Sequence, residues 1–154
     1  MKAIAYTKYG SPDVLKLEEV EKPSPKDNEV LIKVHAASIN TGDSYFLTGK
    51  PFLVRFRPGG LLKPKITILG GDVAGRVEAV GKNVKQFQIG DEVFGDISES
   101  GLGAFAEYVS APETVLTHKP ANLSFEEAAT IPTSGVTVYR GFVIVERFSP
   151  GKKY

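Results

Sequence analysis

The chain has 154 residues, of which 42% are hydrophobic and 24% are charged, as is usual for a soluble globular domain. Its 19 Lys and Arg residues nearly balance 18 Asp and Glu residues, so the net charge of +1 gives no overall attraction to nucleic acid or acidic membranes. The chain lacks cysteine, which excludes disulfides, thiolate zinc sites and a cysteine nucleophile, and its two histidines are too few for an all-histidine metal site.

No apolar run approaches the roughly 20 residues that span a bilayer, and the N-terminus lacks the pattern of a signal peptide. We therefore expect a cytoplasmic domain with no nucleic-acid partner, no membrane partner and no metal centre.

Short strands joined by turns are predicted for the first two thirds of the chain, where glycine and proline are spread out rather than clustered. The clearest strand is 29–38, in which apolar side chains recur at every second position. A loop is expected at 22–28 because it holds two prolines. The other predicted strands are 2–9, 14–20, 72–80, 92–94 and 104–110.

Helical patterns appear only near the end of the chain. Ser124 and Glu127 are spaced as a capping box, which predicts a short helix that Pro132 should end. A second helix is expected over 134–148, although 142–145 (Phe-Val-Ile-Val) would suit a strand equally well.

Several ordered motifs resemble the medium-chain dehydrogenase/reductase superfamily. The run Gly70-Gly-Asp-Val-Ala-Gly75, followed by Gly81 and Val84, is similar to a motif of the zinc alcohol dehydrogenases, but Gly71 and Asp72 stand where those enzymes have His and Glu. Asn40 stands where they have a cysteine ligand. These replacements resemble the zinc-free quinone oxidoreductase branch. Three further stretches agree with the family in order: 87–93, 103–108 and 131–139.

The resemblance implies a mainly β fold, a GroES-like, partly open β-barrel with short helices and a C-terminal helix leading toward an absent Rossmann domain. On this basis residues 1–132 form the catalytic domain, and 133–154 form a connecting helix and the start of a truncated Rossmann domain. The implied function is that of an N-terminal fragment of an NAD(P)H-dependent, zinc-independent oxidoreductase. The parent enzyme would reduce quinones or activated carbonyl and enone compounds by hydride transfer.

Four site residues follow from the same resemblance. Asn40 would donate to a substrate oxygen, Tyr45 would supply a phenol hydrogen bond, and Asp43 would orient a neighbour. The alternative is that Asn40 and Asp43 hold a turn while Tyr45 packs. Thr137 stands where the family places a hydroxyl near the nicotinamide, or it is an ordinary helix-surface threonine.

The parent is expected to use NADP(H) or NAD(H), but this chain alone should bind no nicotinamide cofactor tightly, bind no zinc and be inactive. The one dinucleotide-like glycine pattern, 101–106, leads into a predicted strand and not a helix, so it should not bind phosphate. A second hypothesis is a free-standing GroES-like module that binds or assembles as a co-chaperonin does. The oxidoreductase hypothesis includes a homodimer as a further expectation.

The segment 46–69 is unusual because it holds five cations, no acid and many large apolar side chains. Three roles are consistent with this composition. The segment could be a mobile loop that covers the substrate, a basic surface loop, or a contact with a membrane or another polyanion.

Overall fold

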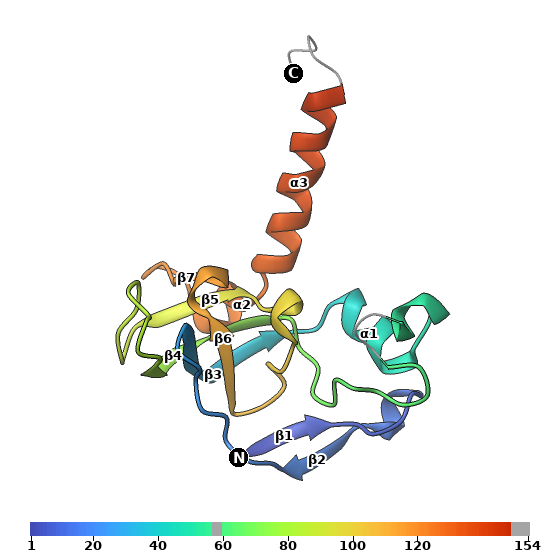
Figure 1. Ribbon diagram of the computed structural model, residues 1–154. Helices are drawn as coiled ribbons and strands as arrows, with labels where there is room; N and C mark the ends of the chain where they lie inside the picture. Colours follow the sequence, from blue (N-terminus) through green and yellow to red (C-terminus); the bar gives the residue numbers. More distant parts are fainter. Residues whose placement is uncertain (57–59, 149–154) are drawn as a thin grey trace.

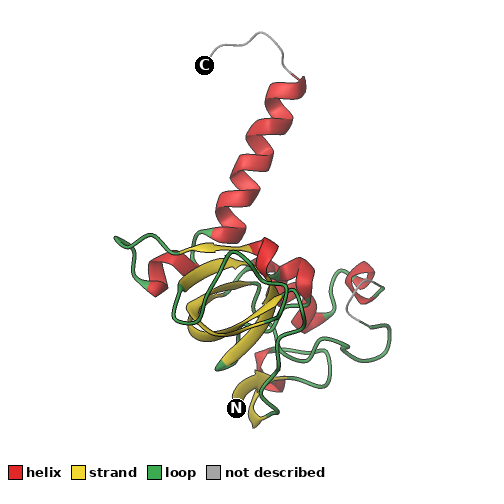
Figure 2. Ribbon diagram, turned by 60° about the vertical axis from the view of Figure 1, so that its left-hand side comes forward, coloured by secondary structure: helices red, strands yellow, loops and turns green. Residues whose placement is uncertain are grey.

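The structure, a computed structural model, describes residues 1–56 and 60–148, with side chains as far as Gly141. Five strands form one antiparallel sheet in the order β6-β3-β4-β5-β7 (Figure 1). The sheet is strongly curved, and β6 and β7 remain its two edges (Figure 2). The predicted mainly β, partly open barrel is therefore confirmed. These strands are β3 (Glu29–Ser38), β4 (Asp72–Val80), β5 (Glu92–Asp96), β6 (Tyr108–Pro112) and β7 (Leu116–His118).

The main core lies on the concave side of the strand pair β3 and β4. Val30 and Ile32 of β3 and Val73 and Val77 of β4 are at most 2% exposed, as the alternation in the sequence predicted. Gly75 of β4 lies so close to β3 that a Cβ there would sit 2.2 Å from the Lys33 carbonyl oxygen. The glycine of the motif is thus required by strand packing.

A separate two-stranded sheet of β1 (Lys2–Ala5) and β2 (Lys16–Glu19) lies below the barrel in Figure 1. The stretch before β6 pairs with it: Ile4 N donates to the Phe105 carbonyl at 2.8 Å and Glu107 N donates to the Lys2 carbonyl at 3.0 Å. The strand expected at 104–110 is therefore wrong in its first half. Phe105 and Glu107 hydrogen-bond to β1, whereas β6 begins at Tyr108, pairs with β3 and ends at Pro112.

A helix that the sequence did not reveal, α1 (Thr41–Thr48), follows β3. Its glycine, threonine and serine residues are weak helix formers, so it has no helical signature in the sequence. Leu47 of α1 packs with Tyr6 and Leu69 in a second core. Four short 3-10 helices lie in the loops of the described chain: η1 (Pro12–Val14), η2 (Phe52–Arg55), η3 (Ser98–Ser100) and η4 (Glu113–Val115).

The capping box predicted α2 (Phe125–Ala129) correctly, since Glu127 N donates to Ser124 Oγ at 3.1 Å and Ser124 N donates to Glu127 Oε2 at 2.8 Å. Helix α3 (Pro132–Phe148) is continuous, which decides the helix-or-strand alternative at 142–145. Pro132 begins α3 in addition to ending α2, because proline suits the first turn of a helix.

Helix α3 stands away from the barrel (Figures 1 and 2). The last part of the predicted Rossmann start, 149–154, lies outside the described residues. No helix of the described chain is long and apolar enough to cross a lipid bilayer.

Candidate functional site

A buried carboxylate joins three elements at one end of the barrel. Asp72, the first residue of β4, is 0% exposed. Its Oδ2 accepts hydrogen bonds from Ser38 Oγ at 2.9 Å and Asn40 Nδ2 at 3.0 Å. Its Oδ1 accepts from both Thr133 N at 3.0 Å and Thr133 Oγ1 at 2.7 Å. Four neutral donors thus hold the end of β3, the start of α1 and the start of α3 at one point.

Asn40 is part of this network. Its Nδ2 donates to Asp72 Oδ2 and also to Ser38 Oγ, at 3.1 Å. Because a carboxylate can only accept, the Asn40 amide must present its NH2 group to Asp72. Both bonds are made by the same Nδ2 group, so this network fixes the orientation of the Asn40 amide.

Asp43 lies one turn into α1 and is 6% exposed. Its Oδ2 accepts from Asn40 N at 2.8 Å and its Oδ1 accepts from Gly70 N at 3.0 Å. Asp43 therefore fixes the start of α1 against the chain that enters β4. Burial, with smaller effects from Tyr9 and the charge of Asp43, raises the pKa of Tyr6 to about 12, so this buried phenol stays protonated.

Tyr45 and Thr137 are the predicted site residues that remain exposed. Tyr45 lies on α1 and is 47% exposed, and its hydroxyl makes no hydrogen bond to any residue that the structure describes. Ile39, which lies between Ser38 and Asn40 in the sequence, is 83% exposed. An apolar side chain just before α1 and a phenol on α1 are therefore accessible to solvent.

Thr137 lies one turn beyond Thr133 on α3 and is exposed. Its Oγ1 donates to the Thr133 carbonyl at 2.7 Å, within the same helix. The predicted cofactor residue is thus connected through Thr133 to Asp72, while its own hydroxyl makes the local bond expected of a helical threonine.

The donor set around Asp72 does not suit zinc. A Cβ on Gly71 would lie 2.6 Å from Ser98 Oγ, so a histidine there would require Ser98 to move. Asp72 already accepts four hydrogen bonds, and the described residues hold no group of three or more potential metal-ligating side chains. Both histidines pack on aromatic rings, His35 on Phe125 and His118 on Phe87.

The glycine pattern at 101–106 offers no phosphate site either. Gly101 and Gly103 have φ of 123° and 122°, and the stretch follows η3 and ends in the bridge between Ala106 and Ala3. No helix begins there to direct backbone N–H groups at a phosphate. The stretch 101–106 thus lacks the strand-to-helix turn that holds the pyrophosphate of a dinucleotide.

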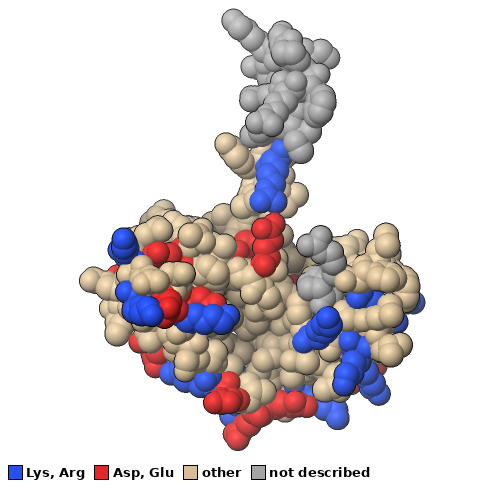
Figure 3. Space-filling model, viewed as in Figure 1, with Lys and Arg blue, Asp and Glu red and all other residues tan. Residues whose placement is uncertain are grey.

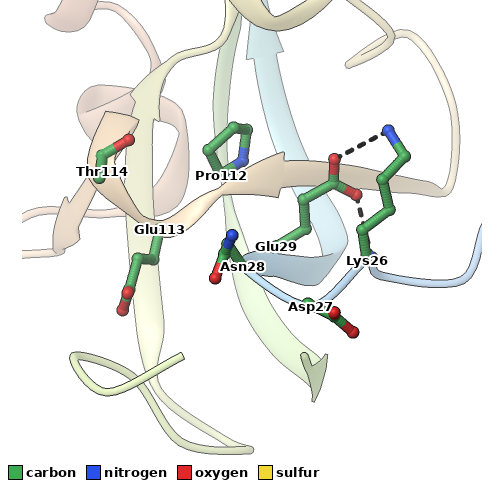
Figure 4. A pocket seen from close by; sticks show the side chains of 7 residues that line it. All are labelled: Lys26, Asp27, Asn28, Glu29, Pro112, Glu113 and Thr114. Carbon is green, nitrogen blue, oxygen red and sulfur yellow. Dashed lines mark hydrogen bonds and ion pairs between the residues drawn. The ribbon is translucent and has the colours of Figure 1, made fainter. Parts of the chain in front are cut away.

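A hollow of about 910 Å³ lies elsewhere, between 26–29 and 112–114 (Figure 4). Three of its charged groups already have partners: Lys26 Nζ donates to Glu29 Oε1 at 3.1 Å, and Glu113 Oε2 accepts from the backbone N–H groups of Lys85 and Gln86, outside the hollow, both at 3.0 Å. None of the predicted site residues lines it. We do not assign it a catalytic role.

The family model "Alcohol dehydrogenase GroES-like domain" matches residues 26–121, which include the whole curved sheet. The chain belongs to this family. The resemblance to the medium-chain dehydrogenase/reductase superfamily and the GroES-like fold are therefore confirmed.

Three relatives illustrate the match. The chain is 45% identical to the 2-methylene-furan-3-one reductase of Solanum lycopersicum and 42% identical to the NADPH-dependent alkenal/one oxidoreductase, chloroplastic, of Arabidopsis thaliana. Each alignment covers 99% of this chain and 39% of the relative. The quinone oxidoreductase structure from Coxiella burnetii is 37% identical, with a TM-score of 0.84, over 95% of this chain and 45% of that one. The chain thus spans about two fifths of the curated relatives.

Sequence reasoning singled out Asn40, Asp43 and Tyr45 but missed Ser38 and Thr133, and it noted Asp72 only as a substitution. A signal existed for Asp72, because this acid directly precedes the uncharged run 73–75 of the predicted strand and so requires partners if that end of the strand is buried. Nothing in the sequence indicates that those partners come from positions 34 residues earlier and 61 residues later.

Proposed function

We propose that this chain is the substrate-side domain of an NAD(P)H-dependent, zinc-independent reductase of quinones or activated enones and carbonyls. The observation that carries the proposal is the Asp72 network: Asn40, which stands where the zinc branch has a cysteine ligand, donates to a buried carboxylate, and the neighbouring Gly71 has no side chain that could bind a metal. Names of the relatives support the reaction class, since they include an NADPH-dependent alkenal/one oxidoreductase and quinone oxidoreductases.

The nicotinamide would supply a hydride to the substrate, and the full reaction converts quinone, NAD(P)H and a proton into hydroquinone and NAD(P)+. Residues of this chain would bind the substrate, exclude water and protonate or hydrogen-bond its oxygen. Tyr45 is the residue we assign to that oxygen, because its phenol is accessible and free among the described residues. Asn40 and Asp43 are positioning residues in this proposal. They hold the first turn of α1, and thereby Tyr45, in place.

Three features support the proposed zinc independence: Asp72 already accepts four hydrogen bonds, position 40 is an amide and position 71 is a glycine. We also propose that the cofactor pyrophosphate binds outside this chain, since the glycine pattern at 101–106 does not lead into a helix. Thr137 is proposed to lie near the nicotinamide, with 1–132 as the catalytic domain and 133–154 as the connection to the cofactor domain. A cytoplasmic location and a homodimer remain predictions, and no observation favours the co-chaperonin hypothesis.

The test compares the protein expressed from its complete gene with the 154-residue chain. NADPH oxidation with 1,4-naphthoquinone and with an α,β-unsaturated ketone is followed at 340 nm. The complete protein should turn over at least one of them after metal chelation, while the chain alone should not. Tyr45→Phe should lower kcat about 100-fold, as expected for loss of a group that stabilises developing charge. Tyr108→Phe on β6 is the matched control. Turnover by the chain alone, or full activity of Tyr45→Phe, would refute the assignment.

A further inference from the structure

Large apolar side chains are exposed together next to α1. We call residues 50–56 and 60–65 the basic–apolar lobe. Five of its apolar side chains are each more than half exposed, from 51% for Leu61 to 90% for Leu62, whereas Val54 is only partly exposed. The five are Phe52, Leu53, Phe56, Leu61 and Leu62. Scattered apolar side chains are common on protein surfaces, but a cluster of this kind indicates a contact with something else.

Direct contacts hold the two stretches of the lobe side by side. Gly60 N donates to the Arg55 carbonyl at 2.9 Å, which places Leu61 and its successor at the end of η2. The rings of Phe52 and Phe56 meet edge to face, with their centroids 5.4 Å apart. The Arg55 guanidinium lies 4.4 Å from the ring centroid of Tyr9, which anchors η2 to the N-terminal segment. The exposed groups therefore sit on one supported surface.

The lobe is also strongly basic. Lys50, Arg55, Lys63 and Lys65 are its described cations, and the segment 46–69 contains no acid. None of the four forms an ion pair with another described residue. Figure 3 shows this segregation on one face: Lys and Arg gather over the α1 side, and carboxylates gather over the β1–β2 hairpin and near the base of α3. The near-neutral charge of the whole chain conceals this local excess.

We propose that the basic–apolar lobe binds the surface of an anionic phospholipid bilayer. Cations beside exposed Phe and Leu side chains match such a surface, because ammonium groups pair with lipid phosphates while the apolar groups enter the acyl boundary. Nucleic acid would satisfy the cations but leave the apolar side chains in water. Self-association would bring two basic lobes together, which like charge opposes. This proposal revises the expectation of no membrane partner, which rested on total charge, and it does not depend on the proposed enzymatic function.

The experiment is co-sedimentation of the 154-residue chain with vesicles. One set contains phosphatidylglycerol and phosphatidylcholine, the other phosphatidylcholine alone. We expect binding to the anionic vesicles in 50 mM salt, at least tenfold weaker binding in 500 mM salt, and no binding to neutral vesicles. A cation near such a surface contributes about a fivefold factor, so Lys50→Gln/Lys63→Gln/Lys65→Gln should lose about 100-fold in partition coefficient. Leu53→Ser/Leu62→Ser should lose about tenfold or more.

The matched control is Lys16→Gln/Leu17→Ser on β2, which removes an exposed lysine and an exposed leucine away from the lobe and should bind as the unmodified chain does. Circular dichroism and thermal melts confirm that each variant is folded. Absence of binding to anionic vesicles at low salt overturns the proposal. An equal loss of vesicle binding in the control variant would also overturn it. Two other results would point to a different partner and overturn it too: binding to duplex DNA that Leu53→Ser/Leu62→Ser leaves unchanged, or a dimer in light scattering that both lobe variants dissociate.

Discussion

Replacing Asp72 by asparagine tests the central claim about the site most directly, because it exchanges one oxygen for an NH2 group and leaves the volume nearly unchanged. Asp72 accepts four hydrogen bonds and presents no donor. In Asp72→Asn the new NH2 group faces one hydroxyl, which can turn to accept from it, and one N–H group, which cannot. At least one bond is therefore lost, and the remaining bonds lose their charged acceptor.

The size of the effect follows from that count. Hydrogen bonds to a charged acceptor contribute about 1.5–3 kcal/mol each, and the variant no longer bears the cost of burying a charge. We expect a net destabilisation of about 3 kcal/mol, which for a domain of this size lowers Tm by about 6–12 °C. Asp72→Ala should be worse, because it leaves all four donors without an acceptor. The effect should also be local, with the Thr133 amide exchanging hydrogen faster than the amides of β3.

Thermal and urea unfolding of Asp72→Asn, with amide exchange read by mass spectrometry, measure both effects. Asp27→Asn is the control, because it removes the same charge from an exposed pair with Lys82 and should cost less than about 1 kcal/mol. If Asp72→Asn unfolds within about 0.5 kcal/mol of the unmodified chain, the network does not hold α3 and our account of the site is wrong. Equal exchange at Thr133 in both proteins would lead to the same conclusion.

Three further predictions address other parts of the fold. Burial opposes ionisation of Glu29, but hydrogen bonds from Lys26 N, Ser110 Oγ and Lys26 Nζ outweigh burial and lower the pKa of Glu29. The ionised Glu29 therefore stabilises the fold above its unfolded pKa, and this stabilisation is lost as the pH falls through the lower folded pKa. Glu29→Gln should therefore cost about 1 kcal/mol at pH 7 in urea titrations, and this cost should shrink as the pH falls through the lowered pKa of Glu29. Ser124→Ala should cost about 1 kcal/mol by removing the cap of α2, and Ser124→Asp should restore it in thermal melts. Gly75→Ala should cost more than about 3 kcal/mol or prevent folding, because its Cβ would meet the Lys33 carbonyl. The control is Gly90→Ala, whose Cβ has open space and whose only cost is the positive φ of that residue, so it should melt much closer to the unmodified chain.

The sequence predicts those parts of the fold that depend on local patterns. Alternation in 29–38 locates β3, and the glycine turn after 72–80 marks the end of β4. The structure buries neighbouring residues on both faces of each strand, at 30–32 in β3 and 72–75 in β4. The Ser124 cap locates α2 because its two hydrogen bonds are formed within four residues. These predictions needed no knowledge of distant partners.

The failures occur where distant partners decide the structure. Helix α1 forms from poor helix residues because its first turn is tied to Gly70 through Asp43, a contact across 27 positions. The stretch 104–107 alternates as a strand should, but it hydrogen-bonds to β1 in the first residues of the chain. Helix and strand propensities depend on neighbouring residues only, so they could predict neither of these long-range contacts.

The same distinction explains the prediction of the site. Resemblance selected Asn40, Asp43 and Tyr45 by position, and the structure does bring Asn40 and Asp43 together at the start of α1. It also shows why a residue type at a ligand position does not define its role. The Asn40 amide has to direct its donors at Asp72, and this constraint comes from a carboxylate that belongs to another strand. Tyr45 differs from Asn40 and Asp43, because its phenol makes no hydrogen bond to any described residue. If Tyr45 contacts the substrate as proposed above, activity should be more sensitive to Tyr45 and stability more sensitive to Asp72.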